Sequence, residues 1–152
     1  MNSLNRYVTF KLEERLFGLY LSHVERIIRA VEVTPLPQAP EVVLGVINMQ
    51  GRIIPVVNIR NRFGLPCREI SLSDHFIIAN TSRRTIALVA DAVGGVVERP
   101  EQEVIAAGEI MPGIEYVESV IKLEDGMIMI LDLGRLLFHE EEQALNEVIK
   151  EI

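Results

Sequence analysis

The stretch that decides the fold runs from Leu36 to Arg60 and reads LPQAPEVVLGVINMQGRIIPVVNIR. Two apolar runs, 42–49 and 53–59, are rich in β-branched residues and flank the triplet 50–52, which contains a glycine. Because β-branched residues favour strands and glycine favours tight turns, this pattern predicts a β-hairpin. Prolines before the hairpin predict a stiff, extended approach: Pro35, Pro37 and Pro40.

Further strand patterns lie on both sides of this hairpin. Alternation of apolar and polar residues, bounded by turn residues, predicts strands at 7–12, 16–21, 31–33, 75–79, 85–92, 93–98, 117–124 and 127–133. A capping box of Ser22 and Glu25, with Val24, Ile27 and Ile28 at helical spacing, predicts a short helix over 22–29. A helical turn is expected at 60–64, and a terminal helix within 134–152.

The hairpin has an internal echo. Residues 46–49 align with 120–123, and residues 54–59 then align with 128–133 without a gap. One explanation is a chance similarity between two hairpins. The other is a pair of similar small β-barrels with about ten short strands between them.

Composition restricts the class of protein. The chain has 152 residues, of which 49% are hydrophobic, and a formal net charge of −7. This length suits one domain, or two small units sharing a core, and the acidic balance disfavours nucleic acid and anionic lipid as main partners. The single cysteine, Cys67, excludes an intrachain disulfide. With no signal peptide and no apolar run long enough to span a bilayer, we expect a cytoplasmic protein.

The sequence holds no arrangement typical of an active site. His23, His75 and His139 lack metal-ligand spacing, and Cys67 has no histidine close by in sequence. Carboxylates such as Asp74 and Asp91 are scattered through strand ends and turns. We therefore expect no metal, no cofactor and no enzymatic activity, and the pattern favours a mostly β binding module.

The central hairpin resembles the core motif of the CheW-like family. That family comprises the bacterial chemotaxis coupling proteins and the regulatory domains of their histidine kinases. The resemblance covers nearly the whole chain, and its motif is specific only in combination. It rests on Pro37 and Pro40, the runs 44–49 and 51–60, Phe63-Gly64, the hairpin containing Gly18, Val24 with Ile27, the strand 87–93 before Val97, and 127–133 ahead of Leu136-Leu137.

The resemblance implies a mostly β fold of two SH3-like five-stranded β-barrels that share a hydrophobic core, with short helices and a C-terminal helix. On this interpretation residues 1–152 form a single domain. We expect the first barrel at roughly 15–82, the second from 5–12 with 83–138, and the terminal helix at 139–152.

The resemblance also implies a function. A coupling protein is an adaptor that joins the cytoplasmic tip of a chemoreceptor, a methyl-accepting chemotaxis protein, to the regulatory domain of a histidine kinase. It would lie at receptor arrays on the inner face of the membrane. Because little besides a short helix accompanies the domain, we expect a stand-alone coupling protein. The alternatives are a scaffold of a non-flagellar pathway, a regulatory domain cut from a kinase, and a small-ligand-binding β-barrel with a concave pocket.

An adaptor needs two binding surfaces, and we assign both as hypotheses. The kinase-binding surface comprises Gly45, Gln50, Gly51 and Arg52, where glycine would let a partner backbone approach closely. These glycines could equally serve turn and bulge geometry alone. The receptor-binding groove between the barrels comprises Val24, Arg26, Ile27, Ile28, Val89 and Val93. For these aliphatic residues the alternative is plain core, which we favour for Val89, whereas we favour the groove for Val24.

Two residues depart from the family pattern. Family members usually have arginine at the position of Gln50 and often an acidic residue at the position of Arg26. If these two positions form an ion pair in the family, this chain lacks that pair in that form. A hydrogen bond from Arg26 to the Gln50 amide oxygen would be weaker than a charge-assisted pair, so we expect an atypical affinity for partners.

Overall fold

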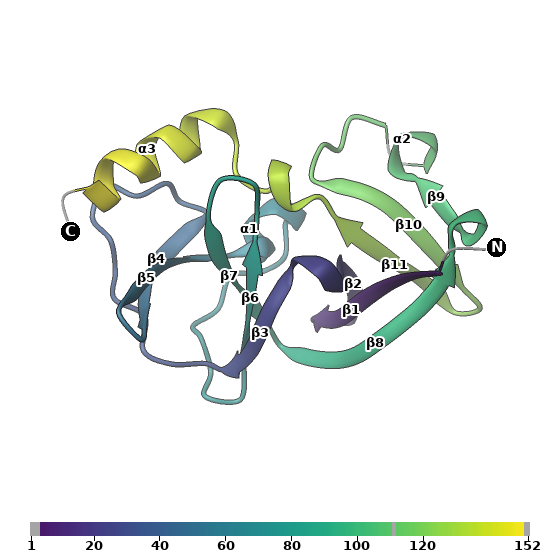
Figure 1. The fold of residues 1–152 in the computed structure, drawn as a ribbon, viewed down its shortest axis with the longest axis horizontal. Coiled ribbons are helices and arrows are strands. Elements are labelled where there is room, and N and C mark those ends of the chain that lie inside the picture. Colours follow the sequence, from purple (N-terminus) through teal and green to yellow (C-terminus); the bar gives the residue numbers. More distant parts are fainter. Residues whose placement is uncertain (1–3, 111, 151–152) are drawn as a thin grey trace.

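The structure is a computed structural model that describes residues 4–110 and 112–150. The expected first and last positions of the domain, 1–3 and 151–152, lie outside the described residues, as does residue 111. The strands form two sheets that lie side by side, with the two chain ends at opposite sides of the molecule (Figure 1). The chain is therefore mostly β, as the sequence predicts.

The first sheet has five strands in the order β3-β6-β7-β5-β4. Its strands are β3 (Val24–Arg29), β4 (Val43–Met49), β5 (Arg52–Val57), β6 (His75–Asn80) and β7 (Thr85–Ala90). The predicted hairpin is the β4–β5 pair, which is antiparallel, and β5 continues the sheet by pairing in parallel with β7.

The second sheet has six strands in the order β8-β1-β2-β11-β10-β9. Its strands are β1 (Leu4–Leu12), β2 (Arg15–Tyr20), β8 (Ala92–Pro100), β9 (Val104–Ala106), β10 (Val117–Leu123) and β11 (Gly126–Leu131). The short strand β9 exceeds the expected five, because the segment after Pro100 pairs with β10 where the sequence shows no clear period.

Helices are short and peripheral. They are α1 (Ile59–Phe63), α2 (Ala107–Ile110) and α3 (His139–Lys150), with 3-10 turns at Leu21–His23, Glu101–Glu103 and Leu133–Arg135. Asn58 caps the start of α1 through its side chain, and Gly64 ends the helix in the left-handed conformation. Helix α3 crosses one end of the five-stranded sheet (Figure 1) and buries Leu145.

Four clusters of buried side chains fill the described part of the molecule, and the smallest comprises Ala107, Val117 and Val120, on α2 and β10. One lies inside the five-stranded barrel and includes Ile54 and Phe76, and a second, inside the six-stranded barrel, includes Tyr7 and Ile128. The largest cluster takes residues from both sheets, among them Phe10, Phe17, Ile77 and Leu88, and it also includes Leu145 of helix α3. The fold is thus two SH3-like barrels packed on one shared core.

The internal echo is a true structural repeat. Ile47 pairs with Ile54 in one hairpin, and the aligned Ile121 pairs with Ile128 in the other. Both hairpins carry a register shift at the aligned position, between Val43 and Gly45 and between Val117 and Ser119. In each barrel the second strand of the hairpin then pairs in parallel with a strand from elsewhere in the chain. Chance similarity between two hairpins does not account for this agreement.

The expected boundaries of the barrels are wrong in two places. Strand β2 lies within the expected first barrel, 15–82, but it pairs with β1 and β11 in the six-stranded sheet. Strand β7 lies within the expected second barrel, but it pairs with β5 and β6 in the five-stranded sheet. The β1–β2 and β6–β7 hairpins each stay whole, so the division falls between hairpins.

The expected helix over 22–29 is also wrong. A single 3-10 turn at Leu21–His23 is followed by strand β3, which pairs with β6. The register shifts between Val24 and Arg26, so that Val24 pairs with Ala79 and Ile27 with Ile77. Because a β-bulge adds one residue, side chains three positions apart point to the same face. The helical spacing in the sequence is therefore the signature of a bulged strand.

Candidate functional site

The turn that joins β4 to β5 is tightly specified. Gln50 and Gly51 both have positive φ, 54° and 87°, as a type I′ hairpin turn requires. The Asn48 side chain accepts a hydrogen bond from the backbone N–H of Gly51 at 2.8 Å. Of the proposed kinase-binding residues, Gln50, Gly51 and Arg52 are exposed at this turn, whereas Gly45 is buried within β4.

Arg52 at this turn is paired with Glu25 at the bulge of β3. The guanidinium donates to both carboxylate oxygens of Glu25, at 2.7 and 3.2 Å, and to the Thr85 hydroxyl at 3.0 Å. The hydrogen bond from Arg52 lowers the pKa of Glu25 below its ordinary value. This bidentate pair connects the edge strand β3 to the start of β5.

The Arg52–Glu25 ion pair lies close in sequence to the two positions that depart from the family pattern: Glu25 precedes Arg26, and Arg52 follows two residues after Gln50. Among the described residues, no hydrogen bond or ion pair joins Arg26 to Gln50. The expected contact through the Gln50 amide oxygen is therefore absent from the structure. Sequence reasoning missed Glu25 and Arg52 as partners, because their approach depends on the pairing of β3 with β6.

Gly45 serves the fold of the chain itself. Its φ is 154°, and a Cβ added there would lie 2.2 Å from the Thr34 carbonyl oxygen. Thr34 and Val46 exchange two backbone hydrogen bonds of 2.9 Å across this contact. The space next to Gly45 is therefore filled by the chain's own backbone, whereas Gly51 has no heavy atom within 4 Å of the added Cβ.

The residues assigned to the receptor-binding groove divide into three groups. Val24 and Val93 are partly buried against the shared core, and Ile27, which pairs with Ile77 of that core, is 38% exposed. Ile28 and Val89 instead pack inside the first barrel. Arg26 is exposed on β3. The structure thus places Val89 in the core, as we favoured, and leaves Val24, Ile27 and Val93 along the border of the shared core.

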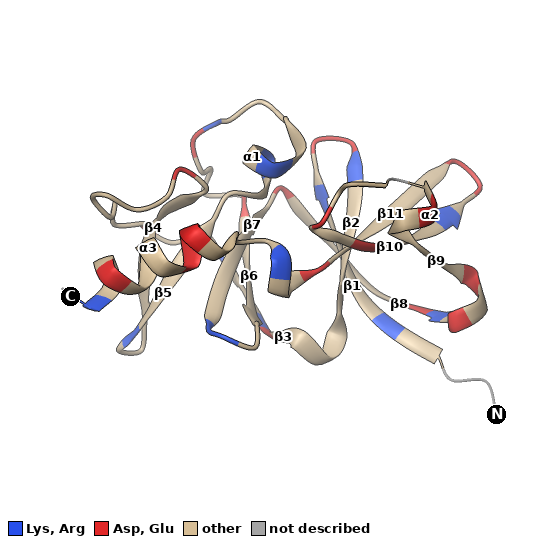
Figure 2. Ribbon diagram, turned by 90° about the horizontal axis from the view of Figure 1, so that it is seen from above, with Lys and Arg blue, Asp and Glu red and all other residues tan. Residues whose placement is uncertain are grey.

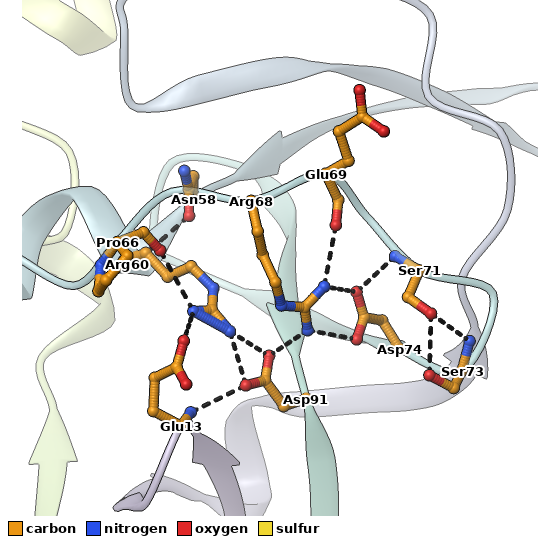
Figure 3. A network of polar contacts seen from close by, with 10 residues as sticks. All are labelled: Glu13, Asn58, Arg60, Pro66, Arg68, Glu69, Ser71, Ser73, Asp74 and Asp91. Carbon is orange, nitrogen blue, oxygen red and sulfur yellow. Dashed lines mark hydrogen bonds and ion pairs between the residues drawn. The ribbon is translucent and has the colours of Figure 1, made fainter.

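A polar network joins the two barrels (Figure 3). None of its residues was assigned to the kinase-binding surface or to the receptor-binding groove. Arg60 is 4% exposed, and its guanidinium donates to Glu13 at 2.8 Å and to both oxygens of Asp91 at 2.6 Å. Arg68 bridges Asp91 at 2.7 Å and Asp74 at 2.7 and 2.9 Å. Glu13 belongs to the β1–β2 turn and Arg60 to α1, so these contacts hold one barrel against the other.

The electrostatics of this network do not suit acid–base chemistry. Burial alone would raise the pKa of Asp91, but hydrogen bonds from the Glu13 backbone N–H and from Arg60 outweigh it and lower that pKa. Asp74 likewise has a lowered pKa, because Arg68 and the Ser71 backbone N–H outweigh the effect of burial. Both carboxylates are therefore held ionised and paired, which favours a structural role.

The remaining candidates for chemistry stay apart. His23 lies in a 3-10 turn, His75 on β6 and His139 at the start of α3. No group of three potential metal ligands occurs among residues 4–110 and 112–150. Basic and acidic residues are interspersed over both barrels (Figure 2), so the described surface offers no basic stripe for nucleic acid. No helix within these ranges is both long and apolar enough to cross a membrane.

Comparison with known proteins agrees with this geometry. Residues 6–141 match the family described as the CheW-like domain. The chemotaxis protein CheW of Treponema pallidum is 29% identical over 144 residues, which cover 91% of this chain and 85% of that protein. The CheW protein of Rhizobium meliloti is 27% identical over 145 residues, which cover 94% of each chain. The crystal structure of the scaffolding protein TtCheW from Thermoanaerobacter tengcongensis superposes with a TM-score of 0.81 at 31% identity, covering 93% of this chain and 96% of that one.

Proposed function

The chain belongs to the CheW-like domain family, and we propose that it is a chemotaxis adaptor that couples chemoreceptors to a histidine kinase. The observation that carries this proposal is the match of the family over residues 6–141, together with the two barrels on one shared core. A protein of this kind works by binding alone and catalyses no reaction. It would act at receptor arrays on the inner face of the membrane.

We assign the kinase's regulatory domain to the turn 50–52 of the first barrel. The turn projects exposed polar side chains, and the bidentate pair with Glu25 holds Arg52 in one orientation. A preordered side chain loses less conformational entropy on binding, which favours affinity. Gly45 contributes indirectly: it lets residues 33–34 pack against β4, the strand that leads into this turn.

Titration calorimetry with a purified kinase regulatory domain tests this assignment. We expect saturable one-to-one binding, weakened about tenfold by Arg52→Gln, since an ordered charged contact is worth about 1.4 kcal/mol or more. Arg6→Gln is the matched control, because Arg6 forms an exposed ion pair with Glu98 on the other barrel. Gln50→Arg restores the usual family residue and is expected to strengthen the complex. Absence of binding by the folded protein would contradict the coupling function for that kinase.

We assign the receptor tip, a helical hairpin, to the border of the shared core at Val24, Ile27 and Val93. Apolar side chains that are partly exposed beside a core can receive the apolar face of a partner helix. Ile27, 38% exposed, offers the largest accessible surface of the three, so it is the position at which substitution disturbs the fold least.

The receptor assignment is tested with Ile27→Asp and with Ile114→Asp as control, because Ile114 is 36% exposed. We expect Ile27→Asp to abolish co-sedimentation with receptor fragments while circular dichroism stays unchanged. Val24→Asp should also weaken receptor binding and still fold. Equal loss of binding with Ile114→Asp, or unfolding of Val24→Asp, would remove these residues from the receptor surface.

A further inference from the structure

A groove of 940 Å³ lies outside both proposed surfaces. It runs between the segment 30–35, which follows β3, and the loop 67–72, which precedes β6. None of the residues assigned to kinase or receptor binding lines it. Its volume lies near the upper end of the range for ligand clefts, which leaves room for several side chains of a partner.

Each wall of the groove carries an accessible apolar side chain. Leu72 is 86% exposed and Val31 48% exposed, and both line the groove. Leu44 and Ile70 also line it, and both pack against the buried cluster of the first barrel. A partner that covers these aliphatic side chains removes apolar surface from water, which stabilises the complex.

The charge around these walls is negative. Glu32, Glu41 and Glu69 line the groove, and none of them forms an ion pair within the described part of the chain. Arg68 also lines it, but its guanidinium is turned toward Asp74 and Asp91, which neutralise it. Figure 3 shows the Glu69 carboxylate pointing away from that network. The groove therefore favours a cationic occupant.

Hydrogen bonds hold the loop 67–72 and the segment 30–35 in place before any ligand binds. The Ser71 backbone N–H donates to Asp74 at 2.8 Å, and the Ala30 backbone N–H donates to the Asp74 carbonyl at 3.0 Å. Together with the bonds from Arg68, these contacts connect both walls of the groove to one another. A preordered groove avoids part of the entropic cost of binding.

The groove is a feature of the first barrel alone. The internal repeat aligns Leu44 with Glu118, and Glu118 accepts a hydrogen bond from Tyr20 at 2.9 Å. The second barrel thus closes with a polar contact where the first barrel presents an aliphatic side chain. The groove is therefore not a by-product of the repeated architecture.

We infer that this groove binds a peptide segment of a protein partner that combines apolar side chains with lysine or arginine. A second copy of this chain, with a formal charge of −7, would bring carboxylates against carboxylates and is disfavoured. The inference rests on the groove alone and holds whether or not the adaptor function is correct.

The experiment titrates the intact protein into a fluorescein-labelled peptide of alternating leucine and lysine and follows fluorescence anisotropy. We expect saturable binding that weakens as salt rises, and no binding of the matching leucine–glutamate peptide. Leu72→Ser should weaken binding about tenfold, because it removes an aliphatic side chain that the bound peptide would cover. Leu4→Ser is its control, since Leu4 is 53% exposed on β1 of the other barrel.

A charge comparison separates the groove from general attraction to an acidic protein. The combined variant Glu32→Gln, Glu41→Gln and Glu69→Gln should lose about tenfold in affinity. The control variant Glu101→Gln, Glu103→Gln and Glu124→Gln has the same net charge and should bind like the parent. In NMR spectra, the backbone amide chemical shifts that change on peptide addition should belong mainly to residues 30–44 and 67–72. Equal loss in both charge variants, shifts elsewhere, or no saturable binding would overturn the inference.

Discussion

At the scale of single residues, Gly45 is the glycine whose surroundings leave the least space for a side chain. Gly45→Ala forces a Cβ to within 2.2 Å of the Thr34 carbonyl oxygen at a positive φ. We expect it to lower the free energy of unfolding by about 3 kcal/mol, from strain and overpacking together. Gly51→Ala has a positive φ but open space, and should cost about 1 kcal/mol. Urea denaturation measures both, and equal costs would contradict the account of Gly45.

Asp91 gives the molecule a predictable dependence on acid. Its pKa is lowered in the folded protein, so the stability it contributes is present above its ordinary pKa of 3.8 and is lost as pH falls through the folded value. We expect the free energy of unfolding to fall as the pH drops below about 4. Asp91→Asn should cost about 2 kcal/mol at pH 7 and make this fall shallower.

The control for this acid dependence is Asp125→Asn, because Asp125 is exposed in the β10–β11 turn and forms no ion pair among the described residues. Chemical denaturation at several pH values between 3 and 7 measures the profile. A profile that steepens in Asp91→Asn, or changes equally in Asp125→Asn, would show that Asp91 does not carry this stability.

At the scale of elements, helix α3 depends on one fully buried side chain. Leu145 has no exposed surface and packs in the shared core, while Arg84 pairs with Glu142 at 3.0 Å and Arg62 with Glu141. We expect Leu145→Ala to lower stability by about 3 kcal/mol through cavity formation. Glu147→Ala on the exposed face should change it by less than about 0.5 kcal/mol. Thermal unfolding distinguishes the two, and similar effects would mean that α3 is not docked.

The elements also show what the sequence could predict. The central hairpin and the last hairpin were predictable, because alternation and a turn glycine are local signals. The strand β3 was not, because its bulge puts Val24 and Ile27 on one face at the spacing of a helix. The Glu25–Arg52 pair was hidden for a related reason: the two residues meet only after β3 joins β6. The groove at 30–35 and 67–72 likewise depends on loop packing, which leaves no periodic signal.

At the scale of the whole molecule, the shared core should make the two barrels unfold together. Residues of both sheets contribute to the largest cluster, and the Arg60 network joins the β1–β2 turn to α1. We expect a single calorimetric transition in which the van't Hoff and calorimetric enthalpies agree. Two separable transitions would show that the barrels are independent units.

The repeat itself was predictable at this scale, but the division of strands between barrels was not. Alignment of residues 46–49 with 120–123 indicated two related hairpins, and their registers agree in the structure. The sequence order, however, does not show that the β1–β2 hairpin completes the second barrel and the β6–β7 hairpin the first. Parallel pairing of β2 with β11 and of β7 with β5 decides this, and such long-range pairing has no local sequence signal.

The most direct test of the adaptor function is co-sedimentation of a kinase with receptor fragments assembled on vesicles. We predict that the kinase enters the pellet only when this protein is added. Ile27→Asp should leave both proteins in the supernatant, and Arg52→Gln should reduce the amount of kinase in the pellet while the adaptor itself still pellets. Pelleting of the kinase without this protein, or its absence from the pellet when the folded protein is bound to receptor, would contradict the coupling function.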